Sequence, residues 1–210
     1  LRGLTEMHVR TVLERMKDQF KLEVVTATPS IPYRETIAGN AEGHARHKKQ
    51  TGGSGQFGDV WIEFEPCDSD DLVFAENVFG GSVPRNFFPA VEKGLRDCIK
   101  KGVLAGYPVV GLKATLTDGS YHPVDSSEMS FKMAASIAYK EGLPKASPCI
   151  LEPIGSLKAY VPDNNTGDLM GELNKRRGRV LGMNPAEDGL QEIVAEVPMS
   201  EMHDFATLIR

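Results

Sequence analysis

The chain has 210 residues, of which 40% are hydrophobic and 25% charged, and its formal net charge is −5. This composition excludes an intrinsically disordered or globally basic protein, and no apolar run reaches the ~18 residues that cross a bilayer. The three cysteines, Cys67, Cys98 and Cys149, are widely spaced, which excludes a disulfide framework or a C-x-x-C site and favours free thiols in a reducing cytoplasm.

The first predicted element is an amphipathic helix over residues 4–20. Its apolar face carries Leu4, Val9, Val12, Leu13, Met16 and Phe20. A strand is predicted at residues 22–25, before Pro29 and Pro32 break the pattern. A single helix and strand cannot bury their apolar faces alone, and the charged first twenty residues are no signal peptide. We therefore expect an excised piece whose residues 1–30 end a preceding domain.

The largest predicted unit covers residues 31–148 and has strands on both sides of a glycine-rich segment. Val60, Ile62 and Phe64 alternate with polar or amphipathic neighbours, as a half-buried strand requires. The strands are predicted at residues 44–50, 60–65, 73–79 and 109–117, the last ending at an Asp118-Gly119 turn. The helices are predicted at residues 86–101, capped by Gly102, and from a capping box at residues 125–128 to Gly142.

A second pattern begins at Cys149 and predicts a unit over residues 149–210. Its strands are expected at residues 150–161, 180–183 and 190–197, with helices at 166–177, capped by Gly178, and from about 200. The order β-α-β-β-α lacks the last strand of a ferredoxin-like unit, so we expect truncation just after Arg210. The predicted fold class is α+β: a mixed-sheet domain followed by a truncated ferredoxin-like domain.

Residues 53–60 fit G-x-G-x-x-G-x-V, the loop that covers ATP phosphates in protein kinases. The lysine that such a loop needs is missing, because no Lys or Arg lies between Asp59 and Glu76, and H-R-D and D-F-G are absent. A strand rather than a helix follows the glycines, which excludes a dinucleotide-binding loop, and no Gly-Lys-Ser/Thr is present. The segment is therefore interpreted as the tip of a β-hairpin.

This hairpin tip has residue types suited to RNA. Arg46, Lys48 and Lys49 lead into it as a local group of cations that can contact phosphates. Gln56 and Phe57 lie among glycines that let RNA approach, and they offer an amide and a stacking face. The alternative is a flexible connection with no binding role.

Six segments resemble elongation factor G in sequence and order. They are residues 33–37 (YRETI), 50–58 (QTGGSGQFG), 104–109 (LAGYPV), 119–128 (GSYHPVDSSE), 151–154 (LEPI) and 197–202 (VPMSEM). The resemblance covers essentially the whole chain. It implies the end of domain III, all of domain IV, with its ribosomal-protein-like β-α-β fold, and most of domain V of a translational GTPase.

The resemblance also implies a function. A parent protein of this family uses GTP hydrolysis to move tRNA and mRNA through the ribosome, with GTP and Mg²⁺ in an upstream domain and no catalytic residue, metal or cofactor in this part. Two domain IV loops meet the mRNA–tRNA duplex at the decoding region. Carried over, the first loop comprises Gly52, Gly53, Ser54, Gly55, Gln56, Phe57 and Gly58, and the second contains Ser120, Tyr121, His122 and Pro123. His122 is at the tip-histidine position, where it can donate to phosphate or ribose.

The implied partners are rRNA of both subunits, ribosomal proteins, tRNA and mRNA, and we expect a cytoplasmic monomer. Three residues depart from the family pattern: Ser54 replaces a basic residue, Pro123 an aspartate and Thr5 a glycine. A lost cation removes one phosphate contact. A divergent paralogue acting in ribosome recycling or remodelling therefore stays open, as does a free-standing RNA-binding module without a GTPase domain.

Two further clusters contain residue types that bind RNA or metals. Lys175, Arg176 and Arg177 end a predicted helix, where basic residues complement the helix dipole, but the resemblance implies RNA contact there as well. His44 and His47 are three residues apart on a strand and so face opposite sides, and no other ligands accompany them, which argues against a metal site.

Overall fold

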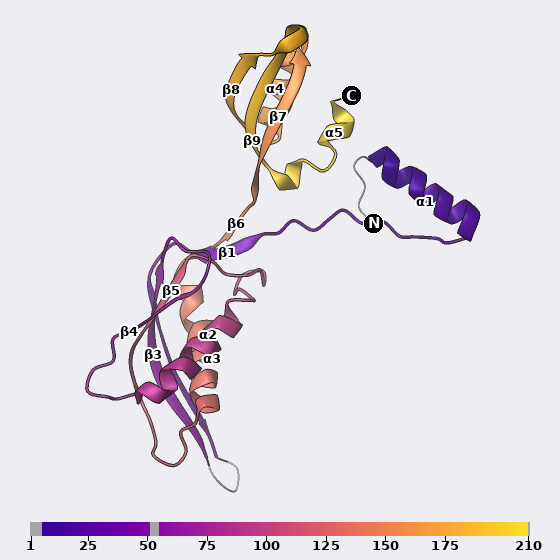
Figure 1. Cartoon of the computed structure of the whole chain (residues 1–210). Helices are drawn as coiled ribbons and strands as arrows, with labels where there is room; N and C mark the ends of the chain where they lie inside the picture. Colours follow the sequence, from indigo (N-terminus) through magenta and orange to yellow (C-terminus); the bar gives the residue numbers. More distant parts are fainter. Residues whose placement is uncertain (1–5, 51–54, 210) are drawn as a thin grey trace. The chain divides into compact units, whose positions relative to one another are not determined.

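The computed structural model describes residues 6–50 and 55–209, and it divides the chain into two compact units (Figure 1). One is Tyr33–Leu151, the central unit; the other combines Leu1–Pro32 with Glu152–Arg210, and we call its second part the C-terminal unit. The predictions for Thr5, Gly52, Gly53 and Ser54 lie outside the described residues. The α+β class is confirmed, with a mixed sheet in the central unit and an antiparallel sheet in the C-terminal unit.

The N-terminal helix is present as α1, Glu6–Phe20. It ends where Lys21 adopts a left-handed conformation (φ 55°) and the amide of Leu22 reaches back to the carbonyl of Met16. The predicted strand at residues 22–25 was wrong: residues 21–33 have no regular structure, and Val25 is 96% exposed. A strand needs a hydrogen-bonded neighbour, and no described strand pairs with this segment.

The central unit is built on a four-stranded sheet of order β2-β3-β5-β4. These strands are β2 Ala41–Lys49, β3 Gln56–Pro66, β5 Leu112–Ser120 and β4 Val73–Glu76. Only β4 runs parallel to its neighbour, β5. A separate pair joins β1, Arg34–Ile37, to β6, Pro148–Leu151.

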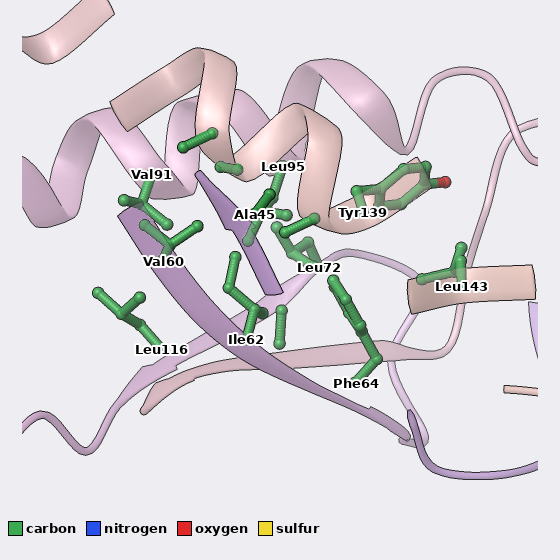
Figure 2. Close-up of a cluster of buried hydrophobic side chains, with 14 of the residues drawn as sticks. Ala45, Val60, Ile62, Phe64, Leu72, Val91, Leu95, Leu116, Tyr139 and Leu143 are labelled. Carbon is green, nitrogen blue, oxygen red and sulfur yellow. The ribbon is translucent and has the colours of Figure 1, made fainter. Parts of the chain in front are cut away.

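Two helices cover one face of this sheet, α2 (Phe88–Cys98) and α3 (Glu128–Gly142) (Figure 1). The inward strand residues Val60, Ile62 and Phe64 are fully buried against them, as the alternation predicted (Figure 2). Gly43 on β2 allows α3 to approach closely, because a Cβ there would run into the carbonyl oxygen of Ala138. The result is a hairpin held rigidly along its length by a helix.

Three details of the predicted central unit were wrong. Asp118-Gly119 is not a turn: β5 continues through it to Ser120, with a bulge opposite Trp61 and Ile62. Gly102 is not the cap of α2, which ends at Cys98 with Ile99 as its C-cap residue; position 102 is glycine because a Cβ would run into the carboxylate of Glu35. The cap of α3 is Ser127, whose Oγ accepts from the amide of Ser130, and not Asp125.

The C-terminal unit has an antiparallel sheet of order β7-β9-β8 (Figure 1). Its elements are β7 Ile154–Pro162, α4 Thr166–Lys175, β8 Arg179–Pro185, β9 Leu190–Pro198 and α5 Phe205–Leu208. The order agrees with the predicted β-α-β-β-α. The single strand predicted at residues 150–161 was wrong, because Pro153 separates β6 from β7, which belong to different sheets.

Short 3₁₀ turns complete the chain at Arg85–Phe87, Leu143–Lys145, Asp163–Asn165, Glu187–Gly189 and Met199–Glu201. The left-handed residue after α4 is Arg177 (φ 59°) and not Gly178, whose amide donates to the carbonyl of Leu173 at 2.7 Å. Gly178 is needed for close packing, since a Cβ would lie 3.0 Å from Cγ1 of Val197. Within residues 6–50 and 55–209, no helix is both long and apolar enough to span a membrane.

Candidate nucleic-acid interface

The two predicted loops meet at one end of the central unit, where Asp125 connects them. The amide of Gly55 donates to Oδ1 of Asp125 at 2.9 Å, and the amide of Phe57 donates to the Asp125 carbonyl at 2.9 Å. Oγ of Ser126 donates back to the carbonyl of Phe57 at 2.9 Å. A Cβ on Gly55 would lie 2.9 Å from Cγ of Asp125, so the glycine is required for this contact. We call residues 46–49, 55–59 and 120–126 the tip.

His122 is held by its own loop. Its Nδ1 accepts from the amides of Val124 (3.3 Å) and Asp125 (3.2 Å), so the neutral ring carries its proton on Nε2. Oδ2 of Asp125 lies 3.4 Å from the same Nδ1, so a protonated ring has an anion beside it. The side chain is 51% exposed. In either protonation state Nε2–H is a donor, which suits it to a phosphate or a ribose hydroxyl.

Asp59 organises the base of the tip, although no sequence pattern pointed to it. It is 3% exposed and accepts from Nε2 of His44 (2.9 Å), Nη2 of Arg46 (3.1 Å) and Oγ of Ser120 (2.7 Å). Two predicted RNA-binding residues, Arg46 and Ser120, therefore have a structural partner. The signal that could have found Asp59 is the hairpin register, which pairs it with Arg46.

The remaining tip residues differ in how exposed they are and in whether they already have a partner within the protein. Lys48 and Lys49 are exposed, and neither forms an ion pair with a residue in the described part of the chain. The amide oxygen of Gln56 lies 2.9 Å from Nε2 of His47, so one half of its amide is engaged. Other predicted residues also reach the surface or its edge: Tyr121 is 46% exposed, Pro123 is exposed, and Phe57 and Gly55 are half-buried.

Gly58, the last residue of the first predicted loop, lies inside the fold and not at the surface. Gly58 is buried on β3, where a Cβ would lie 2.7 Å from the carbonyl of Ser130, so it serves close packing of α3. Gly52, Gly53 and Ser54 lie outside the described residues. Their flanks are fixed by the pairing of Lys49 with Gln56. The strand ends at Lys49 and Gln56 therefore lie at the same end of the sheet as the loop that contains His122.

The basic cluster at the end of α4, Lys175, Arg176 and Arg177, differs from the tip because its arginines are bound by acidic residues. Arg176 is only 11% exposed, and it contacts Glu172 (2.8 Å), Asp204 (2.6 Å) and the carbonyl of Glu201. Its guanidinium also lies 5.5 Å from the ring centroid of Phe205. The hydrogen bonds to Asp204 and Glu172 raise the pKa of Arg176. This arginine connects α4 to the segment around α5.

Arg177 is engaged as well. It makes two bonds of 2.8 Å to Glu152 and lies 3.0 Å from Glu201. Lys175 is 78% exposed and makes one contact of 3.5 Å with Glu172. RNA contact by this cluster stays a prediction, and the geometry gives its two arginines structural partners. No group of three or more His, Cys, Asp or Glu within the described ranges is arranged to hold a metal ion.

Comparison with known proteins agrees with this architecture. The family model described as "Elongation factor G, domain IV" matches residues 29–147, and the model "Elongation factor G C-terminus" matches residues 149–210. An elongation factor G-like protein of Thermotoga maritima is 50% identical over 206 residues, which are 98% of this chain and 30% of that protein.

A crystallised protein of Thermus thermophilus has a similar fold, with a TM-score of 0.86 and 45% identity over 98% of this chain and 30% of that one. The chain thus spans about 30% of the length of these relatives. Because the two family models together match residues 29–147 and 149–210, the chain belongs to the elongation factor G family, a family of translation factors.

Proposed function

We propose that this chain is the ribosome-binding part of a translational GTPase that promotes movement of tRNA and mRNA during elongation. The observation that carries the proposal is the bridge from Gly55 through Asp125 to His122, which joins two loops into one tip. That tip exposes an imidazole donor and the amines of Lys48 and Lys49. Donors of this kind suit the phosphates and 2′-hydroxyls of an RNA duplex.

The action proposed for the tip is positioning and steric insertion. The hairpin strands β2 and β3 pack against α3, and a buried carboxylate, Asp59, joins β3 to β2 and β5 at the base of the tip. These contacts hold the hydrogen-bond donors of the tip in one conformation before RNA binds. Less conformational entropy is therefore lost when the tip binds RNA. GTP and Mg²⁺ would be held by another part of the whole protein, and cytoplasmic, monomeric action on the ribosome belongs to the same proposal.

A second function, ribosome recycling or remodelling by a paralogue, is favoured by two observations. The relative with 50% identity is named an elongation factor G-like protein. Ser54 and Pro123 also depart from the family pattern at the tip. Side-by-side assays of mRNA movement and of subunit splitting, with the whole protein, distinguish the two functions. A free-standing RNA-binding role predicts that no G-x-x-x-x-G-K-S/T motif is encoded upstream of Leu1.

The central test is His122→Ala in the whole protein, with His203→Ala in the C-terminal unit as the matched control. Losing one hydrogen bond to a charged group costs about 1.5–3 kcal/mol, so we expect mRNA movement to slow roughly tenfold or more. His203 is also exposed but lies outside the tip, and its variant should keep the native rate. Native translocation and ribosome co-sedimentation in both variants would refute the assignment of the tip.

A further inference from the structure

His47 is a tip residue to which the proposed function gives no role. The residue is half-buried, and its Nε2 lies 2.9 Å from the amide oxygen of Gln56, which is an exposed residue. The hairpin register explains this contact. His47 is paired with Gly58, which has no side chain, and Gln56 lies two residues before Gly58 on the same face of β3. Diagonal neighbours of this kind are within reach of long side chains.

The hydrogen bond with His47 decides which end of the Gln56 amide is available to a partner. An amide group has an acceptor oxygen and a donor NH₂, and a free glutamine side chain can present either of them. A proton on Nε2, as in the charged imidazole and in one of its two neutral tautomers, makes His47 the donor to the amide oxygen. The NH₂ group of Gln56 is then left for a partner. A proton on Nδ1 alone would reverse the two ends of the amide.

Three further side chains at the surface of the tip are donors as well. Nδ1 of His122 accepts from two backbone amides, which leaves Nε2–H as its donor. Lys48 and Lys49 are exposed, and an ammonium group cannot accept a hydrogen bond. Both carboxylates of the tip are engaged within the protein, since Asp125 accepts from a backbone amide and Asp59 is buried beneath its three donors. A Gln56 amide that presents its NH₂ group therefore extends a surface of donors.

A surface of donors is complementary to the acceptor atoms of RNA. Phosphate oxygens and 2′-oxygens are the same in every nucleotide, and every base pair has an N3 or O2 acceptor at its minor-groove edge. An amide oxygen in the same place would meet these acceptors with a second acceptor, and no hydrogen bond would form. The orientation of the Gln56 amide is therefore decisive for a contact with RNA.

We propose that His47 is a positioning residue that holds the Gln56 amide with its NH₂ group available to the acceptor atoms of RNA. This role rests on the proposed function, in which the tip contacts RNA. His47 acts through Gln56 and makes no contact with RNA of its own. By fixing one orientation before RNA binds, it reduces the conformational entropy that the exposed glutamine loses on binding.

The test is a double-mutant cycle on mRNA movement by the whole protein. Gln56→Ala removes the donor and should slow movement about tenfold. His47→Ala leaves the amide in place but unfixed, so it should slow movement by a smaller factor of about five. The double variant should be no slower than Gln56→Ala, because His47 acts only through Gln56. Losses that multiply to about fiftyfold would give His47 a separate structural role and overturn the proposal.

Three more variants separate this role from the general function of the tip. His47→Gln keeps an N–H donor and should restore most of the native rate. Gln56→Glu keeps the shape of the side chain but replaces the donor by an anion, so it should be at least as slow as Gln56→Ala. Gln19→Ala removes an exposed glutamine from α1 and should keep the native rate. A native rate in Gln56→Ala or Gln56→Glu overturns the proposal, and slow movement in His122→Ala would then leave the proposed function standing.

The position of the proton on His47 is measured directly by nuclear magnetic resonance of the 210-residue chain. The nitrogen chemical shifts of an imidazole distinguish a protonated from an unprotonated nitrogen, and His47→Gln identifies the signal by removing it. We expect a proton on Nε2 at neutral pH. An unprotonated Nε2 would be the acceptor, which reverses the Gln56 amide and overturns the proposal whatever the rates.

Discussion

Two groups of basic side chains look alike in sequence but contact different things in the structure. On the β2–β3 hairpin, Lys48 and Lys49 extend into solvent, and only Arg46 is held by a carboxylate. After α4, both Arg176 and Arg177 are each bound by two acidic residues. A run of basic residues therefore shows where positive charge lies but not whether it is available to RNA.

The difference arises from where the acidic partners lie in the chain. The partners of the cations on β2 are set by register with β3, and among the described β2–β3 pairs Asp59, opposite Arg46, is the one carboxylate that faces an arginine or lysine. Glu152 and Asp204, in contrast, come from segments 25 and 28 residues away from the arginines that they bind. The comparison predicts that the cluster after α4 affects mainly stability and the hairpin mainly ribosome binding.

The largest effect is expected for Arg176→Met. The change keeps the aliphatic stem but leaves Glu172 and Asp204 facing each other without their shared cation, and we expect a loss of about 2 kcal/mol, below the cost of breaking a fully buried pair. Hydrogen exchange of the β9 amides measures the stability of the C-terminal unit. Lys175→Met, at a 78% exposed position, is the matched control and should exchange as the native chain does. Equal exchange in the two variants would contradict the structural role.

The second-largest effect is expected for Asp125→Ala at the tip. Removing the carboxylate leaves the Gly55 amide unpaired and frees Nδ1 of His122 from its neighbouring anion, at a cost of about 1.5 kcal/mol to local order. Hydrogen exchange of the Gly55 amide should accelerate roughly tenfold, and translocation by the whole protein should slow. Asp68→Ala, at an exposed loop position, is the control. Unchanged exchange at Gly55 would mean that the bridge does not order the loop.

These cases show which parts of the fold and site the sequence could predict. Alternation of apolar residues in β3 and the motif at residues 119–128 were enough to predict the hairpin and the second loop. The role of Asp125 could not be predicted, because Asp125, Ser126 and Ser127 are all good helix caps and only the structure shows that Ser127 is the cap. That leaves the carboxylate of Asp125 for Gly55.

Long-range pairing explains the other failures. Residues 22–25 have the composition of a strand but no described neighbour to pair with, and the segment 150–161 is divided by Pro153 between two sheets. Gly102 looks like a helix cap in sequence, but it is glycine because Glu35 lies against it. For residues 22–25 and for Gly102 the deciding neighbour is distant in the chain or missing from the described strands, and periodicity carries no information about such contacts; Pro153, in contrast, is a local signal that the predicted strand passed over.

The third prediction concerns the pH dependence of the stability of the C-terminal unit, where the arginines after α4 have their acidic partners. Hydrogen bonds from Arg177, and then from Ser200, lower the pKa of Glu152 below its ordinary value. A lowered folded-state pKa means that this pair contributes fully above the ordinary glutamate pKa of about 4.3–4.5, and that the contribution is lost as the pH falls through the lowered value. The C-terminal unit should therefore lose stability below about pH 4.5.

The variant Arg177→Ala tests whether the hydrogen bonds from Arg177 lower the pKa of Glu152. Without the guanidinium the Glu152 pKa returns towards its ordinary value, so the difference in melting temperature between pH 7 and pH 4 should shrink by about 3 °C. Arg179→Ala, which removes a more exposed pair with Glu196, is the control and should leave the difference nearly unchanged. An unaltered pH dependence of the melting temperature in Arg177→Ala would show that the ion pair between Arg177 and Glu152 does not cause the loss of stability at low pH.

The smallest effect, and the sharpest test of availability, is expected for Lys48→Ala in ribosome binding. A cation without a carboxylate partner can neutralise one phosphate, so its loss should weaken binding only a few-fold but reduce the slope of log K against log salt by about 0.7–0.9. Lys93→Ala on α2 removes an exposed lysine outside the tip, and its slope should match the native slope. Arg46→Ala should reduce the slope less than Lys48→Ala does, because Asp59 already balances that guanidinium. Equal slopes for Lys48→Ala and Lys93→Ala would mean that RNA does not contact the hairpin lysines, as we expect for Arg176 and Arg177 after α4.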